Sequence, residues 1–179
     1  MVGAPICDSN KNLAITTNFE AFKLIDSNRS KGQMIIYPTT NSGYGIGSKD
    51  KYCNEESPLN PISLYGKTKV AAEKFVMESK NAIGFRLATV FGYSYRMRTD
   101  LLVNNFVFKA INDKKLIIYE PHFRRNYIHV DDVVDAIIFS IKNFNRMKSN
   151  IYNLGLSSAN LTKIMLAKKI KKQLKYLKI

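Results

Sequence analysis

A tyrosine and a lysine four positions apart, Tyr65 and Lys69, are the residues of this chain best suited to chemistry at a hydroxyl-bearing carbon. In a helix this spacing places both side chains on one face. A phenol is a poor base near neutrality because its ordinary pKa is about 10, but a neighbouring ammonium group favours the phenolate and lowers that pKa. The phenolate could then take a proton from a hydroxyl group while hydride leaves the adjacent carbon.

A hydroxyl group precedes this pair in the segment TTNSGYG, where Thr40 is expected to end a buried strand. Open α/β sheets bind ligands at the carboxyl ends of their strands, so Thr40 could hold the same substrate oxygen as Tyr65. Tyr-x-x-x-Lys alone is a common pattern, and the alternative is an exposed lysine beside a half-buried tyrosine. The context favours function, because the tyrosine opens a predicted helix after a proline-containing loop and a strand-end threonine.

Helical and strand patterns alternate along the chain. Periodicity and flanking residues predict helices over 12–28, 63–80 with Ser63 as N-cap, 101–113, from about 132, and over the remainder after 155. Short apolar runs predict strands at QMIIYPTT, 82–92, 116–119 and 151–155, and a segment rich in Asn, Ser, Gly and Pro predicts a loop over 41–61. This alternation predicts an α/β fold with a parallel sheet covered on both faces.

The chain is strongly basic, with 28 Lys and Arg against 14 Asp and Glu and a formal charge of +14 over 179 residues. Nucleic-acid binding therefore has to be considered. The excess is spread along the chain, and its densest run, 168–178, places Ile170, Leu174 and Leu177 between lysines, as on the solvated face of a helix. An anionic substrate would also suit this charge. We rank a nucleic-acid module last, because no helix-turn-helix, zinc-ligand or RNA-binding pattern accompanies it.

Other compositional features narrow the class of protein. Hydrophobic residues make up 45% of the chain, which favours a folded core. No run of about 18 apolar residues predicts a membrane span, and the first residues do not resemble a signal peptide. Cys7 and Cys53 fit neither a disulfide framework nor a metal site. We therefore expect a cytoplasmic protein with no membrane segment and no metal.

A glycine-rich phosphate-binding turn is missing from the sequence. The pattern G-x-G-x-x-G does not occur, and GYGIG at 43–47 lacks both its spacing and the helix that should follow. Without that turn, no helix N-terminus is expected to face a dinucleotide pyrophosphate.

Several motifs, in order along residues 11–160, resemble the NAD-dependent epimerase/dehydratase family, the extended short-chain dehydrogenase/reductases that modify nucleotide sugars. The matching segments are TTNSGYG, SPLNPISLYGKTKVAAEK, FRLATVFG, RRNYIHVDDVVDAI and IYNLG, with a looser match at NFEAF. In NFEAF, Ala21 takes the place of the family's glycine. Five matches in the family's order are much more specific than any one of them.

The resemblance implies roles for individual residues. Tyr65 would be the catalytic base, and Lys69 would lower the pKa of that phenol and bind the nicotinamide ribose of NAD. Thr40 would assist as a hydroxyl group, and Arg125 would contact the diphosphate of the substrate, for which a guanidinium group is well shaped. The alternative for Arg124 and Arg125 is a solvated pair beside Asp131 and Asp132. For His129, inside an apolar strand, a packed or backbone-bonded role is favoured over catalysis.

The departures from the family pattern are informative. Asn41 and Ser42 stand where the family's 4,6-dehydratases carry an Asp-Glu pair, which disfavours dehydration and leaves epimerisation or oxidation–reduction through a keto-sugar. The family's first strands would lie before Met1, its substrate-binding part would extend beyond Ile179, and VGAP at 2–5 resembles the end of an earlier strand. We therefore expect a partial Rossmann-like sheet over 1–98 and a segment over 99–179 that contributes to substrate binding and returns to the sheet.

Two interpretations follow for the chain as a whole. It is either an NAD-dependent epimerase or oxidoreductase of nucleotide sugars, with weak or absent NAD binding by this chain alone, or a non-catalytic subunit that functions only with a partner. The second interpretation implies a homo-oligomer or a complementing chain, because the missing strands should leave a sheet edge and apolar faces uncovered.

Overall fold

The computed structural model describes residues 1–47 and 52–179, so the part of the predicted 41–61 loop at 48–51 lies outside the described residues. The chain divides into two compact units. Unit 1 comprises Met1–Leu87 and Ile137–Leu154, and unit 2 comprises Ala88–Ala136 and Gly155–Ile179. The functional division of the chain near residue 98 stays a prediction. None of the helices in the described residues is both long and apolar enough to span a membrane.

Unit 1 is built around a parallel sheet of three strands in the order β1-β2-β5, which confirms the predicted α/β fold with a parallel sheet. The strands are β1 (Ile35–Thr40), β2 (Ala82–Leu87) and β5 (Asn150–Leu154). The register aligns Thr39 of β1 with Arg86 of β2 and Asn153 of β5. Because side chains alternate along a strand, these three residues project from one face of the sheet.

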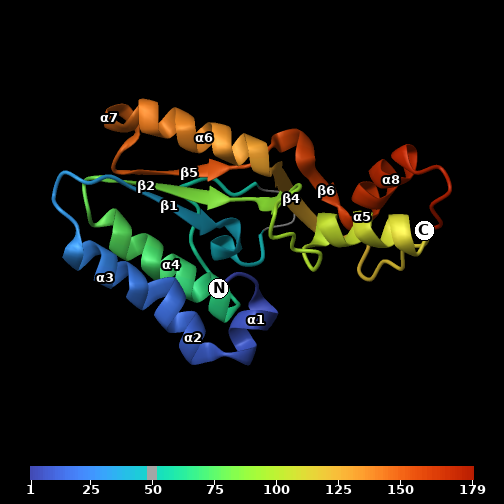
Figure 1. Ribbon diagram of the computed structural model, residues 1–179, viewed down its shortest axis with the longest axis horizontal. Coiled ribbons are helices and arrows are strands. Elements are labelled where there is room, and N and C mark those ends of the chain that lie inside the picture. The colour runs from blue at the N-terminus through green and yellow to red at the C-terminus, as the bar shows by residue number, and fades with distance from the viewer. Residues whose placement is uncertain (48–51) are drawn as a thin grey trace. The chain divides into compact units, whose positions relative to one another are not determined.

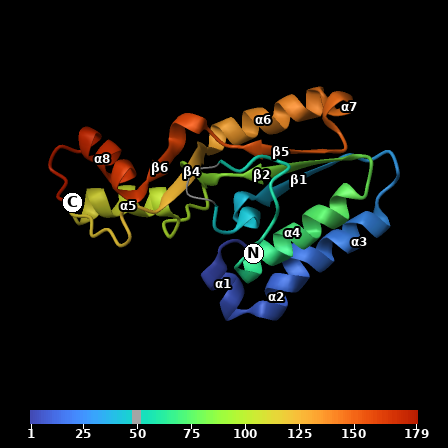
Figure 2. The same cartoon turned by 180° about the vertical axis from the view of Figure 1, so that it is seen from behind.

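Helices cover both faces of this sheet (Figures 1 and 2). On one face, Tyr37 packs with Phe22, Ala72 and Val76. On the other, Ile83 and Phe85 pack with Phe144 and partly buried neighbours. The helical segments of unit 1 are α1 (Ala4–Ser9), α2 (Lys11–Ile15), η1 (Thr16–Glu20), α3 (Ala21–Asn28), η2 (Asn41–Tyr44), α4 (Leu64–Met77), the part of α6 (Val130–Lys142) from Ile137, and α7 (Phe144–Met147).

Helix α4 begins where the local sequence predicts it. Ser63 is the N-cap, and its Oγ accepts a hydrogen bond from the backbone N–H of Gly66 at 3.1 Å. The buried residues of α4 include Ala72 and Val76, which pack with Tyr37 of β1. The predicted helix over 63–80 is therefore confirmed for most of its length.

Unit 2 has a smaller sheet, in which β4 pairs parallel to β3 and antiparallel to β6. Its core joins Val103 and Phe106 to Leu166 and Leu177. Ile170 and Leu174 pack against this core, so the apolar face predicted for the basic C-terminal segment is confirmed, although the helix ends before Leu174. The elements are β3 (Thr89–Phe91), α5 (Leu102–Asn112), β4 (Arg124–His129), the part of α6 before Ile137, η3 (Ser157–Ala159), β6 (Asn160–Thr162) and α8 (Lys163–Gln173).

Three predicted strands differ from the structure. The apolar run 116–119 is not a strand, and the isolated bridge beside it joins Lys115 to Lys178. The segment 82–92 is two strands rather than one, because β2 and β3 pair with different sheets. The segment 2–5 leads into α1 instead of ending a strand, since Gly3 is the N-cap of that helix and Pro5 lies in its first turn.

Candidate active site

Tyr65 and Lys69 lie in the first two turns of α4, the helix that packs against β1. Both residues are partly buried. Their spacing puts them on the same face of the helix, one turn apart. The structure therefore gives this pair the common orientation that its spacing predicts.

Thr40 is the last residue of β1, at the carboxyl edge of the sheet, and is only 7% exposed. Its Oγ1 accepts a hydrogen bond from the backbone N–H of Ser42 at 3.2 Å, which helps to cap η2. Because the hydroxyl oxygen is the acceptor, the hydroxyl proton stays available for donation to another oxygen. The predicted role of Thr40 in holding a substrate oxygen stays a prediction.

The turn that follows Thr40 packs closely against the start of α4, and two glycines allow this approach. A Cβ atom placed on Gly66 would lie 3.3 Å from the carbonyl oxygen of Ser42. One placed on Gly43 would lie 2.9 Å from the Cγ2 atom of Val70. This packing places the end of β1 beside the turn of α4 that carries Tyr65.

Lys69 points toward aromatic rings of the sheet and of α3. Its Nζ lies 4.2 Å from the ring centroid of Tyr37 and 6.0 Å from that of Phe22. Burial lowers the pKa of Lys69 from 10.5 to about 8, although the charge of Glu73 acts in the opposite direction. Lys69 is therefore mostly protonated at pH 7 and can stabilise a phenolate beside it.

Tyr37 lies beneath this pair and is fully buried. Burial, followed by the charges of Tyr65 and Glu73, raises the pKa of Tyr37 well above its ordinary value. Among the described residues, no group forms a hydrogen bond with the Tyr37 hydroxyl. Tyr37 is therefore a neutral ring next to the two residues that could do chemistry.

A buried ion pair on the same side of the sheet was not singled out by the sequence analysis. Arg86 of β2 contacts both carboxylate oxygens of Glu73 on α4, with Nη2 2.7 Å from Oε1 and Nε 3.2 Å from Oε2. The Arg86 Nη1 atom also donates to the hydroxyl of Tyr44 and to the carbonyl oxygen of Glu55, each at 2.9 Å. The Tyr44 hydroxyl in turn donates to Asn153 at 2.6 Å.

This network ties α4, β2, β5 and the turn after β1 together. A signal for it was present in the sequence, since Arg86 is a charged residue within an otherwise apolar strand, and such a residue needs a buried partner. The partner, Glu73, could not be chosen from the sequence, because it lies on a different element.

Arg125 belongs to unit 2, where it is exposed on β4 opposite Leu161 of β6. Its neighbour Arg124 donates to the carbonyl oxygen of Asn160 at 2.7 Å. Among the described residues, neither arginine forms an ion pair with Asp131 or Asp132. The predicted contact of Arg125 with a phosphate stays a prediction.

His129 has the backbone-bonded role that was favoured over catalysis. Its Nδ1 accepts a hydrogen bond from the backbone N–H of Asp131 at 3.2 Å, at the start of α6. Its ring packs edge-on against Phe91, with 5.3 Å between the ring centroids.

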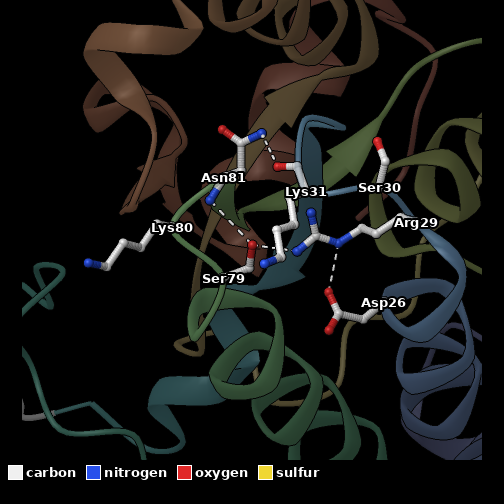
Figure 3. A pocket seen from close by; sticks show the side chains of 7 residues that line it. All are labelled: Asp26, Arg29, Ser30, Lys31, Ser79, Lys80 and Asn81. Carbon is white, nitrogen blue, oxygen red and sulfur yellow. Dashed lines mark hydrogen bonds and ion pairs between the residues drawn. The ribbon is translucent and has the colours of Figure 1, made fainter.

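A cavity of about 430 Å³ lies at the opposite edge of the unit 1 sheet (Figure 3). It is lined by Asp26, Arg29, Ser30, Lys31, Ser79, Lys80 and Asn81, which precede β1 and β2 or end α3 and α4. Arg29 is already paired with Asp26 at 2.7 Å and bonded to Ser79 (Figure 3). The ends of α3 and α4 carry partial negative charge, which disfavours an anion there. The residues that line this cavity bond neighbouring elements to one another, and the cavity is separate from the candidate active site.

Comparisons with known proteins decide the family. The model of the NAD dependent epimerase/dehydratase family matches residues 8–155. The chain belongs to this family. As a family member it is 26% identical over 166 residues to the UDP-glucose 4-epimerase of Lactobacillus helveticus, a match covering 80% of this chain and 50% of the relative. It is 28% identical over 151 residues to human dTDP-D-glucose 4,6-dehydratase, covering 80% of this chain and 41% of the relative.

Solved structures show the same fold. The crystal structure of dTDP-glucose 4,6-dehydratase from Bacillus anthracis in complex with NAD matches with a TM-score of 0.79 at 21% identity, covering 93% of this chain and 54% of that one. The structure of MoeE5 in complex with UDP-glucose and NAD matches with a TM-score of 0.82 at 20% identity, covering 97% and 59%. This family member thus spans about half the length of the relatives it matches.

Proposed function

We propose that this chain serves in the NAD-dependent epimerisation or oxidation–reduction of a nucleotide sugar, through a keto-sugar intermediate. The observation that carries the proposal is the packing of the Thr40 turn against the start of α4, next to Tyr65 and Lys69. Relatives named as a UDP-glucose epimerase and a dTDP-glucose dehydratase support the class of substrate.

The chemistry of this chain is proton transfer and positioning. The Tyr65 phenolate accepts the proton of a sugar hydroxyl group, and the C–O bond becomes a carbonyl as hydride leaves the carbon. Lys69 favours the phenolate by its charge, and Thr40 donates a hydrogen bond to the same oxygen. NAD, when bound, accepts that hydride and can return it. Return of hydride to the opposite face of the carbonyl carbon inverts the centre, and Tyr65 gives its proton back.

The residues present fit one part of NAD. Tyr65 and Lys69 supply a hydroxyl and an ammonium group suited to a ribose, and Arg125 would hold the diphosphate of the substrate. No glycine-rich turn for the pyrophosphate occurs in the printed sequence. We therefore expect this chain alone to bind NAD weakly or not at all, and a micromolar affinity by calorimetric titration would contradict that expectation.

Epimerisation or oxidation–reduction is favoured over dehydration by the turn after Thr40. Asn41 and Ser42 occupy the positions in which dehydration would need an acid and a base. A side-chain amide is neither a useful acid nor a useful base near neutrality, and the pKa of an aliphatic hydroxyl group such as that of Ser42 is far too high for either role.

The test is turnover of a panel of UDP- and dTDP-hexoses with NAD, followed by chromatography and mass spectrometry. It is run on the chain alone and on the chain mixed with a polypeptide that carries the G-x-G-x-x-G turn. Tyr65→Phe should lower turnover by about 10²–10⁴-fold and should weaken cofactor affinity much less, because Lys69 is retained. Tyr176→Phe, at an exposed tyrosine remote in sequence, is the matched control. Equal activity of the Tyr65→Phe and unsubstituted proteins would refute the proposed role.

A second candidate function is that of a non-catalytic subunit. It is supported by β1, whose outer edge pairs with no strand among the described residues. Unpaired strand edges favour association with another chain. Sedimentation should then show a dimer or a complex with a complementing chain, and a compact monomer with full turnover would count against it.

A further inference from the structure

We propose that Tyr37 is a positioning residue for Lys69, whose ammonium group it holds against its ring face by a cation–π interaction. The inference rests on the proposed function, in which Lys69 acts on Tyr65. It concerns a strand residue that lies outside the Tyr-x-x-x-Lys pattern.

The geometry is that of a cation over an aromatic ring. The Lys69 Nζ lies 4.2 Å from the Tyr37 ring centroid, well within the roughly 6 Å over which such attraction acts. Tyr37 is 0% exposed, so water does not screen the interaction as it would at the surface. Phe22 packs edge-on against Tyr37, with 4.6 Å between centroids and 76° between ring planes, and so restricts the orientation of the Tyr37 ring.

Lys69 has no carboxylate partner among the described residues, although Glu73 lies one helical turn further along. The carboxylate of Glu73 is occupied by Arg86, through three contacts of 2.7–3.2 Å. Of the two aromatic rings near the Lys69 ammonium group, that of Tyr37 is the nearer, at 4.2 Å against 6.0 Å for Phe22. This matters for function because a carboxylate would neutralise the charge that acts on Tyr65, whereas a neutral ring leaves it in place.

Among the described residues, few charged or titratable groups lie near Lys69. Glu73 comes from α4 itself, as does Tyr65 one turn before Lys69, and Tyr37 comes from β1. On α3, Lys23 is paired with Glu20 at the surface. Because burial raises the pKa of the Tyr37 hydroxyl, that ring stays neutral over the working range of pH. A change in the pKa of Lys69 when Tyr37 is substituted would therefore come from loss of the neutral ring and not from loss of a charge on Tyr37.

The experiment measures the pKa of Lys69 in the full chain by ¹³C NMR of methylated lysines, with its signal assigned through Lys69→Arg. Tyr37→Leu keeps an apolar residue but removes the ring, and should lower the pKa of Lys69 by about 0.5–1.5, because the charged form loses its partner. Tyr37→Phe keeps the ring and is the matched control, with an expected change below about 0.3. An unchanged or raised pKa in Tyr37→Leu would overturn the proposal.

A second series covers the case in which Tyr37→Leu does not fold. Phenylalanine and phenylalanines with increasing numbers of ring fluorines are placed at position 37. Fluorine withdraws electron density from the ring face with little change in shape, so the pKa of Lys69 should fall with each added fluorine. A pKa that is independent of fluorination would refute the cation–π role. Neither measurement needs turnover. An inactive protein in which the pKa of Lys69 depends on fluorination would refute the proposed function alone. An active protein in which the pKa of Lys69 does not depend on fluorination would refute the role of Tyr37 alone.

Discussion

Two cations, Arg86 and Lys69, lie in unit 1 beside the same helix, and their surroundings differ. Arg86 is 5% exposed and has a carboxylate, a phenol and a backbone carbonyl as partners. Lys69 is partly buried and has, among the described residues, aromatic rings but no ion-pair partner. Burial lowers the pKa of Lys69 to about 8, whereas Arg86 remains charged at any accessible pH.

The two cations differ in how their charge is balanced. The charge of Arg86 is paired with Glu73, and this pair connects α4 to β2. Lys69 forms no ion pair among the described residues, and the proposed function assigns its charge to Tyr65. Burying an ammonium group without an ion-pair partner costs stability.

The largest effect is expected when the compensated pair is broken. Glu73→Leu leaves Arg86 buried without its carboxylate and should lower the free energy of unfolding by about 3–5 kcal/mol. Urea denaturation followed by circular dichroism measures the change. The double change Glu73→Leu with Arg86→Met removes both charges and should cost less than Glu73→Leu alone. If the double variant is as unstable as the sum of the two single variants, the ion pair is not what Glu73 provides.

An intermediate effect of opposite sign is expected at Lys69. Because its pKa is lowered from 10.5 to about 8, the folded protein binds this proton less tightly than the unfolded chain does. The cost of burial is therefore fully present below about pH 8, and stability should rise as the pH increases from about 8 toward 10.5. Lys69→Met removes the charge and should raise the unfolding free energy at pH 7 by about 1–2 kcal/mol, a value discounted for partial exposure.

Urea titrations at pH 7 and pH 9.5 test this prediction. The advantage of Lys69→Met should shrink at the higher pH, where the unsubstituted protein has already lost most of the Lys69 charge. Lys23→Met, at an exposed lysine of α3, is the matched control and should show no such dependence. A constant difference between the two pH values would contradict the lowered pKa. Turnover should be lost in Lys69→Met under all conditions.

The smallest effect is expected at the Tyr37 hydroxyl, which has no hydrogen-bond partner among the described residues. Tyr37→Phe removes a buried polar group that forms no bond and should raise the unfolding free energy by about 0.5–1 kcal/mol. Thermal and urea denaturation measure it, with Tyr52→Phe at an exposed tyrosine as the control. Destabilisation by Tyr37→Phe would mean that an ordered water molecule bonds to the hydroxyl.

The sequence predicted the features that depend on local patterns. The Ser63 cap and the apolar face of α4 follow from residue types at fixed spacing, and both are present in the structure. The run at 116–119 shows the limit of such patterns. Leu116 is buried in the core of unit 2, but Ile117 is 64% exposed, and none of the strands in the described residues pairs with this run. An apolar run becomes a strand only when another strand is available to satisfy its backbone groups.

The break between β2 and β3 within 82–92 also depends on which strands are available as partners. The segment is apolar throughout, but β2 pairs within one sheet and β3 within another, and Ala88 separates them. The choice of partner strand depends on segments far along the chain, such as β5 and β4. The spacing of apolar residues within 82–92 therefore cannot predict where one strand ends and the next begins.

By itself, the sequence determined the alternation of helices with the buried strands of unit 1, the shared face of Tyr65 and Lys69, and membership of the family through its ordered motifs. Only the tertiary structure decided the partners of the charges. Glu73 lies four residues after Lys69, a spacing that would allow an ion pair along the helix. Arg86, brought across from β2, takes that carboxylate instead. Lys69 is left against the ring of Tyr37, because ion-pair energy depends on distance and burial in space, which the spacing along a chain does not set.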